Sequence, residues 1–263
     1  MRARKRRISN GVQRITKEDI HKVYLYNLGR GPTLKARNKA LYMLLKDSGL
    51  RVSDASNLNV EDYHAARNVE VGGVNFKVFK PFATLKTGDL AHTILGPEST
   101  THLDKYIGTR TTGPLFTDTQ GQRWKSPAMT THIMNSRRDA LGDGIRVSAH
   151  SFRKYFVTTL EGAGLPADWI RILQGKAQYV YSRPQDGPEL LEAYARAYDH
   201  LRILPSQHLE GQVRSLSDEV KGLRQLVQDF TNIDPDYYLK LRQKEKETGN
   251  GVFTDTPPPP PEE

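Results

Sequence analysis

One block of alternating apolar residues, between positions 69 and 95, interrupts a chain that is otherwise patterned as helices. Apolar side chains recur there with a period close to two, at Val69, Val71, Val74, Phe76 and Val78. This period is typical of half-buried strands, and Lys-Thr-Gly-Asp within the block predicts an antiparallel hairpin. We expect about three short strands. The sequence therefore predicts an α+β fold that is mainly helical and carries a small antiparallel sheet.

Helical spacing and helix-ending residues define the segments on either side of this block. A first helix begins after the capping residue Thr16, and a second, at about residues 34–48, ends at Gly49. Ser53 or Asp54 can cap a short helix that follows. After the block, further helices are expected to open near Gly96, Ser126, Ser148, Pro166 and Asp186.

Charge and residue usage narrow the classes of function. A net charge of +9 suggests a polyanionic partner, most simply nucleic acid, and residues 1–14 form a basic arm that is either a solvated tail or a phosphate contact. The absence of cysteine excludes disulfides, thiolate metal sites and cysteine nucleophiles. No apolar run is long enough to span a bilayer, and the first ten residues lack the apolar segment of a secretory signal. We expect a cytoplasmic protein with no membrane contact.

The stretch from Ser148 to Phe156 places a histidine and an arginine together. His150 and Arg153 are three residues apart, so they share a helix face with about 5–6 Å between their Cβ atoms. Phe152 and Phe156 form an adjoining apolar stripe that can anchor this helix. An arginine fork matches two phosphate oxygens, and a histidine beside it can donate a further hydrogen bond. A solvated helix can also carry the same pair by chance.

Two further basic residues stand at sharp turns. Arg51 follows Gly49 at the corner between two helices, where it either points into a cleft or caps the preceding helix. Lys86 lies at the tip of the hairpin, where it either reaches a substrate or remains in solvent. Neither Arg51 nor Lys86 alone is strong evidence for a substrate-binding site.

Taken in order, these motifs resemble the tyrosine recombinase (phage integrase) family. They are Gly-Leu-Arg-Val-Ser-Asp at 49–54, Lys-Thr-Gly at 86–88, His-Ser-Phe-Arg at 150–153, a basic residue after Leu-Gln-Gly at 173–175, and then a tyrosine. The resemblance covers about residues 15–204. The segment Tyr181-Ser182-Arg183-Pro184, with the helix sequence after it, is most similar to archaeal and archaeal-virus members.

The resemblance implies a site-specific recombinase that cleaves and rejoins double-stranded DNA through a 3′-phosphotyrosyl intermediate, without metal ion, other cofactor or ATP. Arg51 and Arg153 would hold the non-bridging phosphate oxygens, and His150 would add a donor. Lys86 would protonate the leaving 5′-oxygen as general acid. Lys176 would contact phosphate at a position where many members carry histidine or tryptophan. The implied setting is integration or excision of a mobile element, viral or plasmid.

The nucleophile is open among four tyrosines. Tyr181 best matches the archaeal Tyr-x-Arg/Lys-Pro pattern, although it follows Lys176 sooner than the family spacing. Tyr198, in Tyr-Asp-His-Leu, resembles the segment after the nucleophile of bacterial members. Tyr179 and Tyr194 are further alternatives, and Tyr194 and Tyr198 also have the spacing of ordinary helix packing. Tyr181 is the preferred assignment, and cleavage in cis or in trans is left open.

The remaining segments complete the predicted organisation. Residues 15–204 are the expected catalytic domain. Family members usually carry a separate core-binding domain before it, so this sequence is either a catalytic fragment or a minimal enzyme. Residues 205–232 carry a heptad pattern, which predicts either an amphipathic helix on its own domain or a coiled coil that joins copies into a homo-oligomer on DNA. Residues 233–263 are polar and proline-rich, and we expect them to be disordered.

Two other functions compete with recombination. A type IB topoisomerase would use the same chemistry to relax supercoils without partner exchange. A non-catalytic DNA-binding regulator would use the arginines for phosphate contact alone, so that changes at Arg51 or Arg153 would alter only affinity and its salt dependence.

Overall fold

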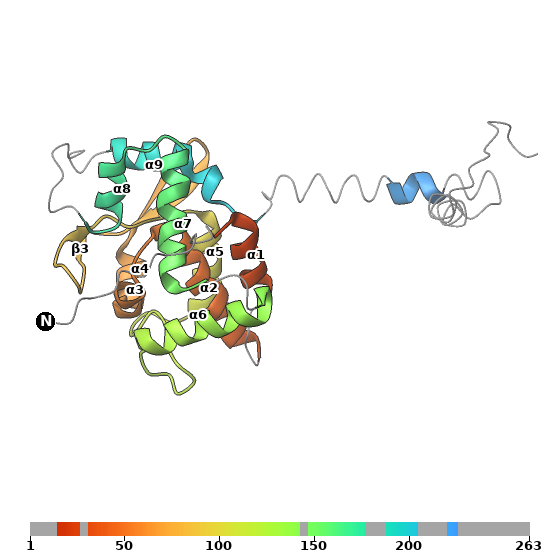
Figure 1. Ribbon diagram of the computed structural model, residues 1–263, viewed down its shortest axis with the longest axis horizontal. Helices are drawn as coiled ribbons and strands as arrows, with labels where there is room; N and C mark the ends of the chain where they lie inside the picture. Colours follow the sequence, from red (N-terminus) through yellow and green to blue (C-terminus); the bar gives the residue numbers. More distant parts are fainter. Residues whose placement is uncertain (1–14, 27–30, 143–146, 177–187, 205–219, 226–263) are drawn as a thin grey trace, which may run out of the picture. The chain divides into compact units, whose positions relative to one another are not determined.

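The computed structural model describes residues 15–26, 31–142, 147–176, 188–204 and 220–225. The chain divides into two compact units, Met1–Leu204 and Pro205–Glu263. The described part of the first unit contains, in chain order (Figure 1), α1 (Lys17–Tyr26), α2 (Pro32–Ser48), α3 (Val52–Asn57), α4 (Val60–Ala65), β1 (Arg67–Val71), β2 (Val74–Val78), β3 (Phe82–Ala83), β4 (Leu90–Ala91), β5 (Ile94–Leu95), α5 (Pro97–Ile107), α6 (Ser126–Leu141), α7 (Ala149–Gly162), α8 (Ala167–Leu173) and α9 (Pro188–Leu201). The predicted mainly helical class with a small antiparallel sheet is confirmed.

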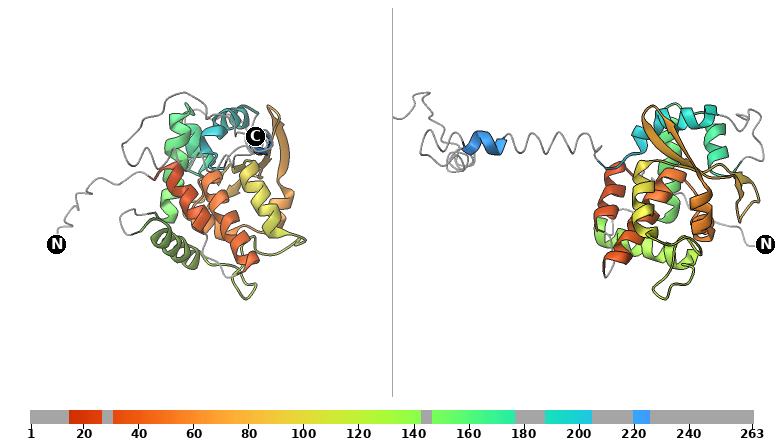
Figure 2. Two further views of the ribbon diagram at one scale, coloured as in Figure 1. Left: turned by 90° about the vertical axis from the view of Figure 1, so that its right-hand side faces the viewer. Right: turned by 180° about the vertical axis from the view of Figure 1, so that it is seen from behind.

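The strands form two small antiparallel sheets, where the sequence predicted one ribbon of about three strands. The first has the order β1-β2-β5, and Val71 pairs with Val74 at the tight end of the β1–β2 hairpin. The second is the β3–β4 hairpin, in which Phe82 pairs with Ala91. Figure 2 shows the β1–β2 hairpin along one side of the first unit, where β2 lies against α5. Three of the five strands are only two residues long, too short to show alternation in the sequence.

Helix α2 is the centre of the first unit. It packs between α5 and α7 (Figure 1), and five successive side chains in its middle are fully buried: Leu41, Tyr42, Met43, Leu44 and Leu45. Gly49 ends the helix with a left-handed φ of 58°, as predicted from the sequence. A Cβ at Gly49 would lie 2.4 Å from the ring of Phe156 on α7, so close helix packing also requires glycine there.

A group of buried charges, which we call the Lys46 cluster (Lys46, Asp47 and Glu98), joins α2 to α5. The Lys46 ammonium contacts Asp47, lies 2.9 Å from Glu98 Oε2 and donates to the carbonyl of Leu201 at 3.0 Å. Burial alone would lower the pKa of Lys46, but the two carboxylates outweigh it and raise that pKa above its ordinary 10.5.

The Lys46 cluster also fixes the chain that leaves α9. Glu98 accepts hydrogen bonds from the backbone amides of Ile203 and Leu204, the latter at 2.7 Å. Asp47 accepts from the amide of Gly96 at 3.1 Å and from the hydroxyl of Ser99 at 2.6 Å, so it satisfies donors at the start of α5. The end of the first unit is therefore held by side chains from two other helices.

Of the second unit, the structure describes residues 220–225, which are helical. Val220 and Leu223 are exposed there, with relative accessibilities of 49% and 56%. The predicted basic arm 1–14, the tail 233–263 and most of the segment 205–232 lie outside the described residues. Within the described ranges, the helices are too short or too polar to cross a membrane.

Candidate active site

The corner after α2 presents the first of the predicted site residues. Arg51 occupies the N-cap position of α3, so the prediction that Ser53 or Asp54 caps this helix is wrong. The Arg51 side chain is 20% exposed, and its Nη1 lies 3.8 Å from Asp54 Oδ2 one helical turn later. Among the described residues, Arg51 Nη1 is buried with no hydrogen-bond partner. The guanidinium therefore has donor capacity that the described part of the chain does not satisfy.

Lys86 lies in the loop between β3 and β4, as the sequence predicted. The loop is closed by two backbone hydrogen bonds of 2.9 Å, from the Thr84 amide to the Asp89 carbonyl and from the Gly88 amide to the Thr84 carbonyl. The Lys86 side chain is exposed. Its position is therefore set by the hairpin backbone.

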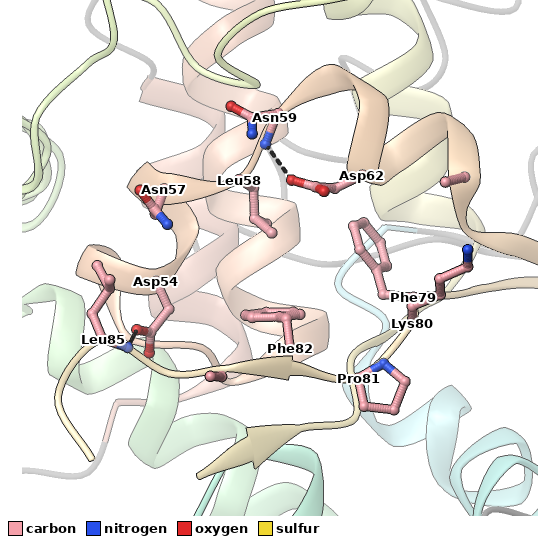
Figure 3. Close-up of a pocket in the computed structure, with 12 residues that line it drawn as sticks. Asp54, Asn57, Leu58, Asn59, Asp62, Phe79, Lys80, Pro81, Phe82 and Leu85 are labelled. Carbon is pink, nitrogen blue, oxygen red and sulfur yellow. Dashed lines mark hydrogen bonds between the residues drawn. The ribbon is translucent and has the colours of Figure 1, made fainter. Parts of the chain in front are cut away.

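Asp54 connects the Lys86 hairpin to Arg51. Its Oδ1 accepts a hydrogen bond of 2.9 Å from the amide of Leu85 (Figure 3), the residue before Lys86. The side chain of Asp54 is 1% exposed, so little water competes for this bond. The sequence predicts a helix cap at Asp54, within the Gly-Leu-Arg-Val-Ser-Asp motif, but not its bond to Leu85. Its spacing of three from Arg51, from the N-cap to the third residue of α3, is the signal that could have identified it.

Arg153 is the most buried of the predicted cations. Ser148 caps α7 in a reciprocal arrangement with Ser151, which fixes the start of the helix that carries it. The Arg153 guanidinium donates to the carbonyl of Gly49 at 2.9 Å and to that of Gln174 at 3.1 Å. These bonds join α7 to the corner before Arg51 and to the end of α8.

The bond from Arg153 to Gly49 brings Arg153 close to Arg51, so that the two positive charges interact. Burial, and then the positive charge of Arg51, lower the pKa of Arg153 to about 10, although the carboxylate of Asp54 acts in the opposite direction. Arg153 therefore remains protonated at neutral pH. The structure brings Arg51 and Arg153, which are distant in sequence, to one place.

Lys176 belongs to the same group of cations. The Lys176 side chain is exposed. Partial desolvation at its base still lowers its pKa, and the charges of Arg153 and Arg51 lower it further. The preceding residue, Gly175, has a φ of 63°, and a Cβ there would lie 2.4 Å from the side chain of Thr84. The turn that carries Lys176 therefore packs against the base of the Lys86 hairpin.

His150 is more exposed to solvent than Arg153, which follows it one turn later on α7. It lies in the first turn of α7, one turn before Arg153, and its side chain is exposed while that of Arg153 is 4% exposed. The two residues therefore share the helix face that the sequence predicted, with the histidine nearer to solvent.

The four candidate tyrosines fall into two pairs. Tyr179 and Tyr181 lie outside the described residues. Tyr194 and Tyr198 are buried in the core of the first unit, where the Tyr194 hydroxyl donates to the Asp47 carbonyl at 2.9 Å and that of Tyr198 lies 3.4 Å from Asp47 Oδ2. Burial, followed by the negative charge of Asp47, raises the pKa of both well above its ordinary value. Both features argue against these two tyrosines as nucleophiles.

The arrangement suits a phosphate group. Among the described residues, Arg51, Arg153 and Lys176 bring three positive charges close to the carboxylate of Asp54, and the Lys86 hairpin adjoins them. A pocket of about 390 Å³, with Asp54, Phe82 and Leu85 in its lining, lies beside the hairpin base (Figure 3). The described ranges contain no group of three histidine, aspartate or glutamate side chains able to hold a metal ion. Oriented cationic donors of this kind can stabilise the charge that develops on a reacting phosphate.

This chain is similar to known integrases and recombinases both in sequence pattern and in fold. The sequence pattern of a family described as the phage integrase family matches residues 13–178. The structure resembles XerA recombinase (16% identity, TM-score 0.50, covering 79% of this chain and 64% of that one) and an integrase from mycobacterium phage Brujita (18% identity, TM-score 0.50, covering 80% and 66%). The chain thus matches slightly less than two thirds of each of them, and at these identities the likeness shows the fold alone. No curated protein sequence matches this chain.

Proposed function

The chain belongs to the phage integrase family, and from this premise we propose that it is a site-specific DNA recombinase. It cleaves and rejoins strands through a 3′-phosphotyrosyl intermediate, without metal or ATP, in the integration or excision of a mobile element. The observation that carries the proposal is the buried Arg153 guanidinium beside Arg51 and Lys176, with the Lys86 hairpin tied to the same place by Asp54.

Each side chain has a role in the proposed step. A tyrosine oxygen forms a bond to phosphorus while the bond from phosphorus to the 5′-oxygen breaks. Arg51 and Arg153 hold the non-bridging oxygens, and Lys176 and His150 add donors to them. Lys86 gives a proton to the departing 5′-oxygen. The reverse reaction with a 5′-hydroxyl of another strand reseals the DNA, because the phosphotyrosyl bond retains the energy of the phosphodiester.

The nucleophile in this proposal is Tyr181. The burial of Tyr194 and Tyr198 supports a tyrosine from the segment between α8 and α9. The test is to incubate the protein with a nicked suicide DNA substrate, digest the trapped complex and map the modified residue by mass spectrometry. We expect the label on Tyr181 and no adduct with Tyr181→Phe. Label on Tyr179 would move the nucleophile, and DNA binding without any label would favour a non-catalytic regulator.

The wider setting is also a proposal. Residues 15–204 act as the catalytic domain on double-stranded DNA in the cytoplasm, as part of a homo-oligomer, with residues 1–14 in contact with phosphates. The net charge of +9 supports a DNA partner, and the Tyr-Ser-Arg-Pro segment supports an archaeal virus or plasmid as the source. Recombination between paired sites on a plasmid, rather than relaxation of a single plasmid, would separate this function from a type IB topoisomerase.

Removing the Asp54 carboxylate is expected to slow DNA cleavage by about 10²-fold while DNA binding remains. In Asp54→Ala the Leu85 amide loses its acceptor, so the Lys86 loop is no longer fixed, and a displacement of about 1 Å can have this effect. The rate of adduct formation on the suicide substrate measures it. Asp62→Asn is the matched control, because Asp62 lines the same pocket but accepts from the Asn59 amide at the start of α4. Equal losses in both variants would contradict the role given to Asp54.

The pKa of Lys176 is expected to rise in the variant Arg51→Gln. This pKa lies below the ordinary 10.5, so on raising the pH Lys176 loses its charge before a lysine without charged neighbours does. Removing the positive charge of Arg51 removes one of the causes, so the titration midpoint moves upward. NMR of ¹³C-methylated lysines, with the Lys176 signal identified by its loss in Lys176→Arg, measures both midpoints. An unchanged midpoint would show that Arg51 and Lys176 do not share a site.

A further inference from the structure

Thr84 stands where the Lys86 hairpin meets the end of α8. Its side chain is buried, whereas residues 85–88 that follow it are exposed. Its backbone closes the loop, because its amide donates to the Asp89 carbonyl and its carbonyl accepts from the Gly88 amide, each at 2.9 Å. Any residue other than proline could form these two bonds. They therefore do not account for a threonine side chain at this position.

The hydroxyl and the methyl group of Thr84 have different neighbours. The hydroxyl shares a hydrogen bond of 2.9 Å with the hydroxyl of Thr87, the residue after Lys86. The methyl group lies against the backbone of Gly175. A Cβ added at Gly175 would be 2.4 Å from Thr84 Cγ2, closer than two carbon atoms can approach. One side chain thus contacts both the loop that carries Lys86 and the turn that carries Lys176.

The turn that carries Lys176 is fixed by its own backbone. The Gly175 amide donates to the Ile172 carbonyl at 3.1 Å and the Lys176 amide to the Arg171 carbonyl at 2.8 Å, which is the bond pair of a Schellman cap. The His92 amide, just after β4, donates to the same Ile172 carbonyl at 3.3 Å. The hairpin is therefore joined to α8 by a backbone hydrogen bond as well as by the side chain of Thr84.

We propose that Thr84 is a positioning residue that fixes the placement of Lys86 relative to Lys176. Its hydroxyl orients the loop of the general acid, and its methyl group holds the turn of the phosphate donor against that loop. The roles of the two lysines rest on the function proposed above, whereas the two contacts of Thr84 do not. The donor to the leaving oxygen and a donor to the non-bridging oxygens are thus placed together before DNA binds.

Two conservative substitutions separate the two contacts. Thr84→Val keeps a methyl group against Gly175 and removes the hydroxyl, whereas Thr84→Ser keeps the hydroxyl and removes the methyl group. We expect each variant to form the covalent DNA adduct about 10-fold more slowly, since a small displacement of a reacting group has effects of this size. Thr93→Val and Thr93→Ser are the matched controls and are expected to keep the normal rate. Thr93 is also buried, but its hydroxyl has no hydrogen-bond partner among the described residues.

A substrate in which sulfur replaces the bridging 5′-oxygen distinguishes the two losses. Its leaving group departs with the electron pair of the phosphorus–sulfur bond and needs no proton, because a thiolate leaves far more readily than an alkoxide. Thr84→Val is therefore expected to react with this substrate as fast as the unchanged protein. Thr84→Ser is expected to stay about 10-fold slower, because the displaced Lys176 acts on the non-bridging oxygens of both substrates.

A compensating pair of substitutions tests the contact between Thr84 and Gly175. Gly175→Ala places a Cβ where it meets Thr84 Cγ2, and we expect it to lose most of its adduct formation. Thr84→Ser removes Cγ2 and leaves room for that Cβ. The double variant Gly175→Ala/Thr84→Ser is therefore expected to react several-fold faster than Gly175→Ala alone. Equal rates would show that the methyl group does not set the position of the turn.

The other outcomes separate this inference from the proposed function. If the unchanged protein forms adduct but Thr84→Val is equally slow on both substrates, or neither Thr84 variant is slowed, the positioning role is overturned. If the unchanged protein forms no adduct at all, the proposed function fails, and amide hydrogen exchange then tests the placement alone. Thr84→Ser is expected to speed exchange at Lys176, and Thr84→Val at Gly88. Unchanged exchange in both variants would overturn the inference.

Discussion

Replacing Arg153 by alanine is expected to reduce the rate of covalent adduct formation by at least about 10³-fold, the loss typical of removing a charged donor from a reacting phosphate or oxyanion. The guanidinium is protonated at neutral pH and lies with Arg51 and Lys176. It also donates hydrogen bonds to two buried backbone carbonyls, those of Gly49 and Gln174. Their loss of a partner is expected to lower the free energy of unfolding by about 2–4 kcal/mol. Single-turnover cleavage and urea denaturation measure the two effects separately.

Arg51→Ala is the control that separates catalysis from folding. The described residues offer Arg51 Nη1 no hydrogen-bond partner, and its ion pair with Asp54 is 3.8 Å long. We therefore expect a similar loss of cleavage with a much smaller loss of stability. If Arg153→Ala forms adduct at the normal rate at a temperature where it is folded, the proposed phosphate contact is wrong and Arg153 is a structural residue.

Replacing Lys46 by methionine is expected to lower the free energy of unfolding by about 3–5 kcal/mol, one of the largest effects of a single substitution in this chain. Methionine fills a similar volume but leaves the carboxylates of Asp47 and Glu98 buried without their cation. The raised pKa of Lys46 means that this stabilisation is present throughout neutral pH and is lost only as the pH rises above 10.5 towards the pKa of the folded state. Urea denaturation at pH 7 measures the loss.

Two further variants complete this experiment. Lys35→Met changes an exposed lysine of the same helix and is expected to alter stability by no more than about 0.5 kcal/mol. Lys46→Met/Glu98→Gln removes one of the unbalanced carboxylates and is expected to be more stable than Lys46→Met alone, as coupled charges require. If the loss in the double variant equals the sum of the losses in Lys46→Met and Glu98→Gln, Glu98 does not depend on Lys46.

Local sequence signals predicted the features that depend on neighbouring residues. Gly49 and Thr16 predicted where helices end and begin, because a left-handed cap and a capping side chain act within one turn. The Lys-Thr-Gly-Asp sequence placed Lys86 in a hairpin loop for the same reason. The roles of Arg51, Lys86, His150, Arg153, Lys176 and Tyr181 came from the family resemblance and stay predictions.

Contacts between distant segments could not be predicted in this way. Lys46 and Asp47 stand at the polar end of a helix, and nothing within one turn indicates that Glu98 from another helix neutralises the lysine. Asp54 has the composition of a helix cap, yet its partner is an amide 31 residues later. Such pairs depend on how the helices are packed, which periodicity does not encode.

The bonds of Glu98 to Ile203 and Leu204 have a mechanical consequence. A pulling force on the chain beyond Leu204 would meet these two hydrogen bonds and the Lys46–Leu201 contact before it reached the rest of α9. The strain would pass into α2 and α5, the most deeply packed helices, rather than unwinding α9 turn by turn. The hydrogen bonds of Glu98 and Lys46 therefore couple the C-terminal end of the first unit to α2 and α5.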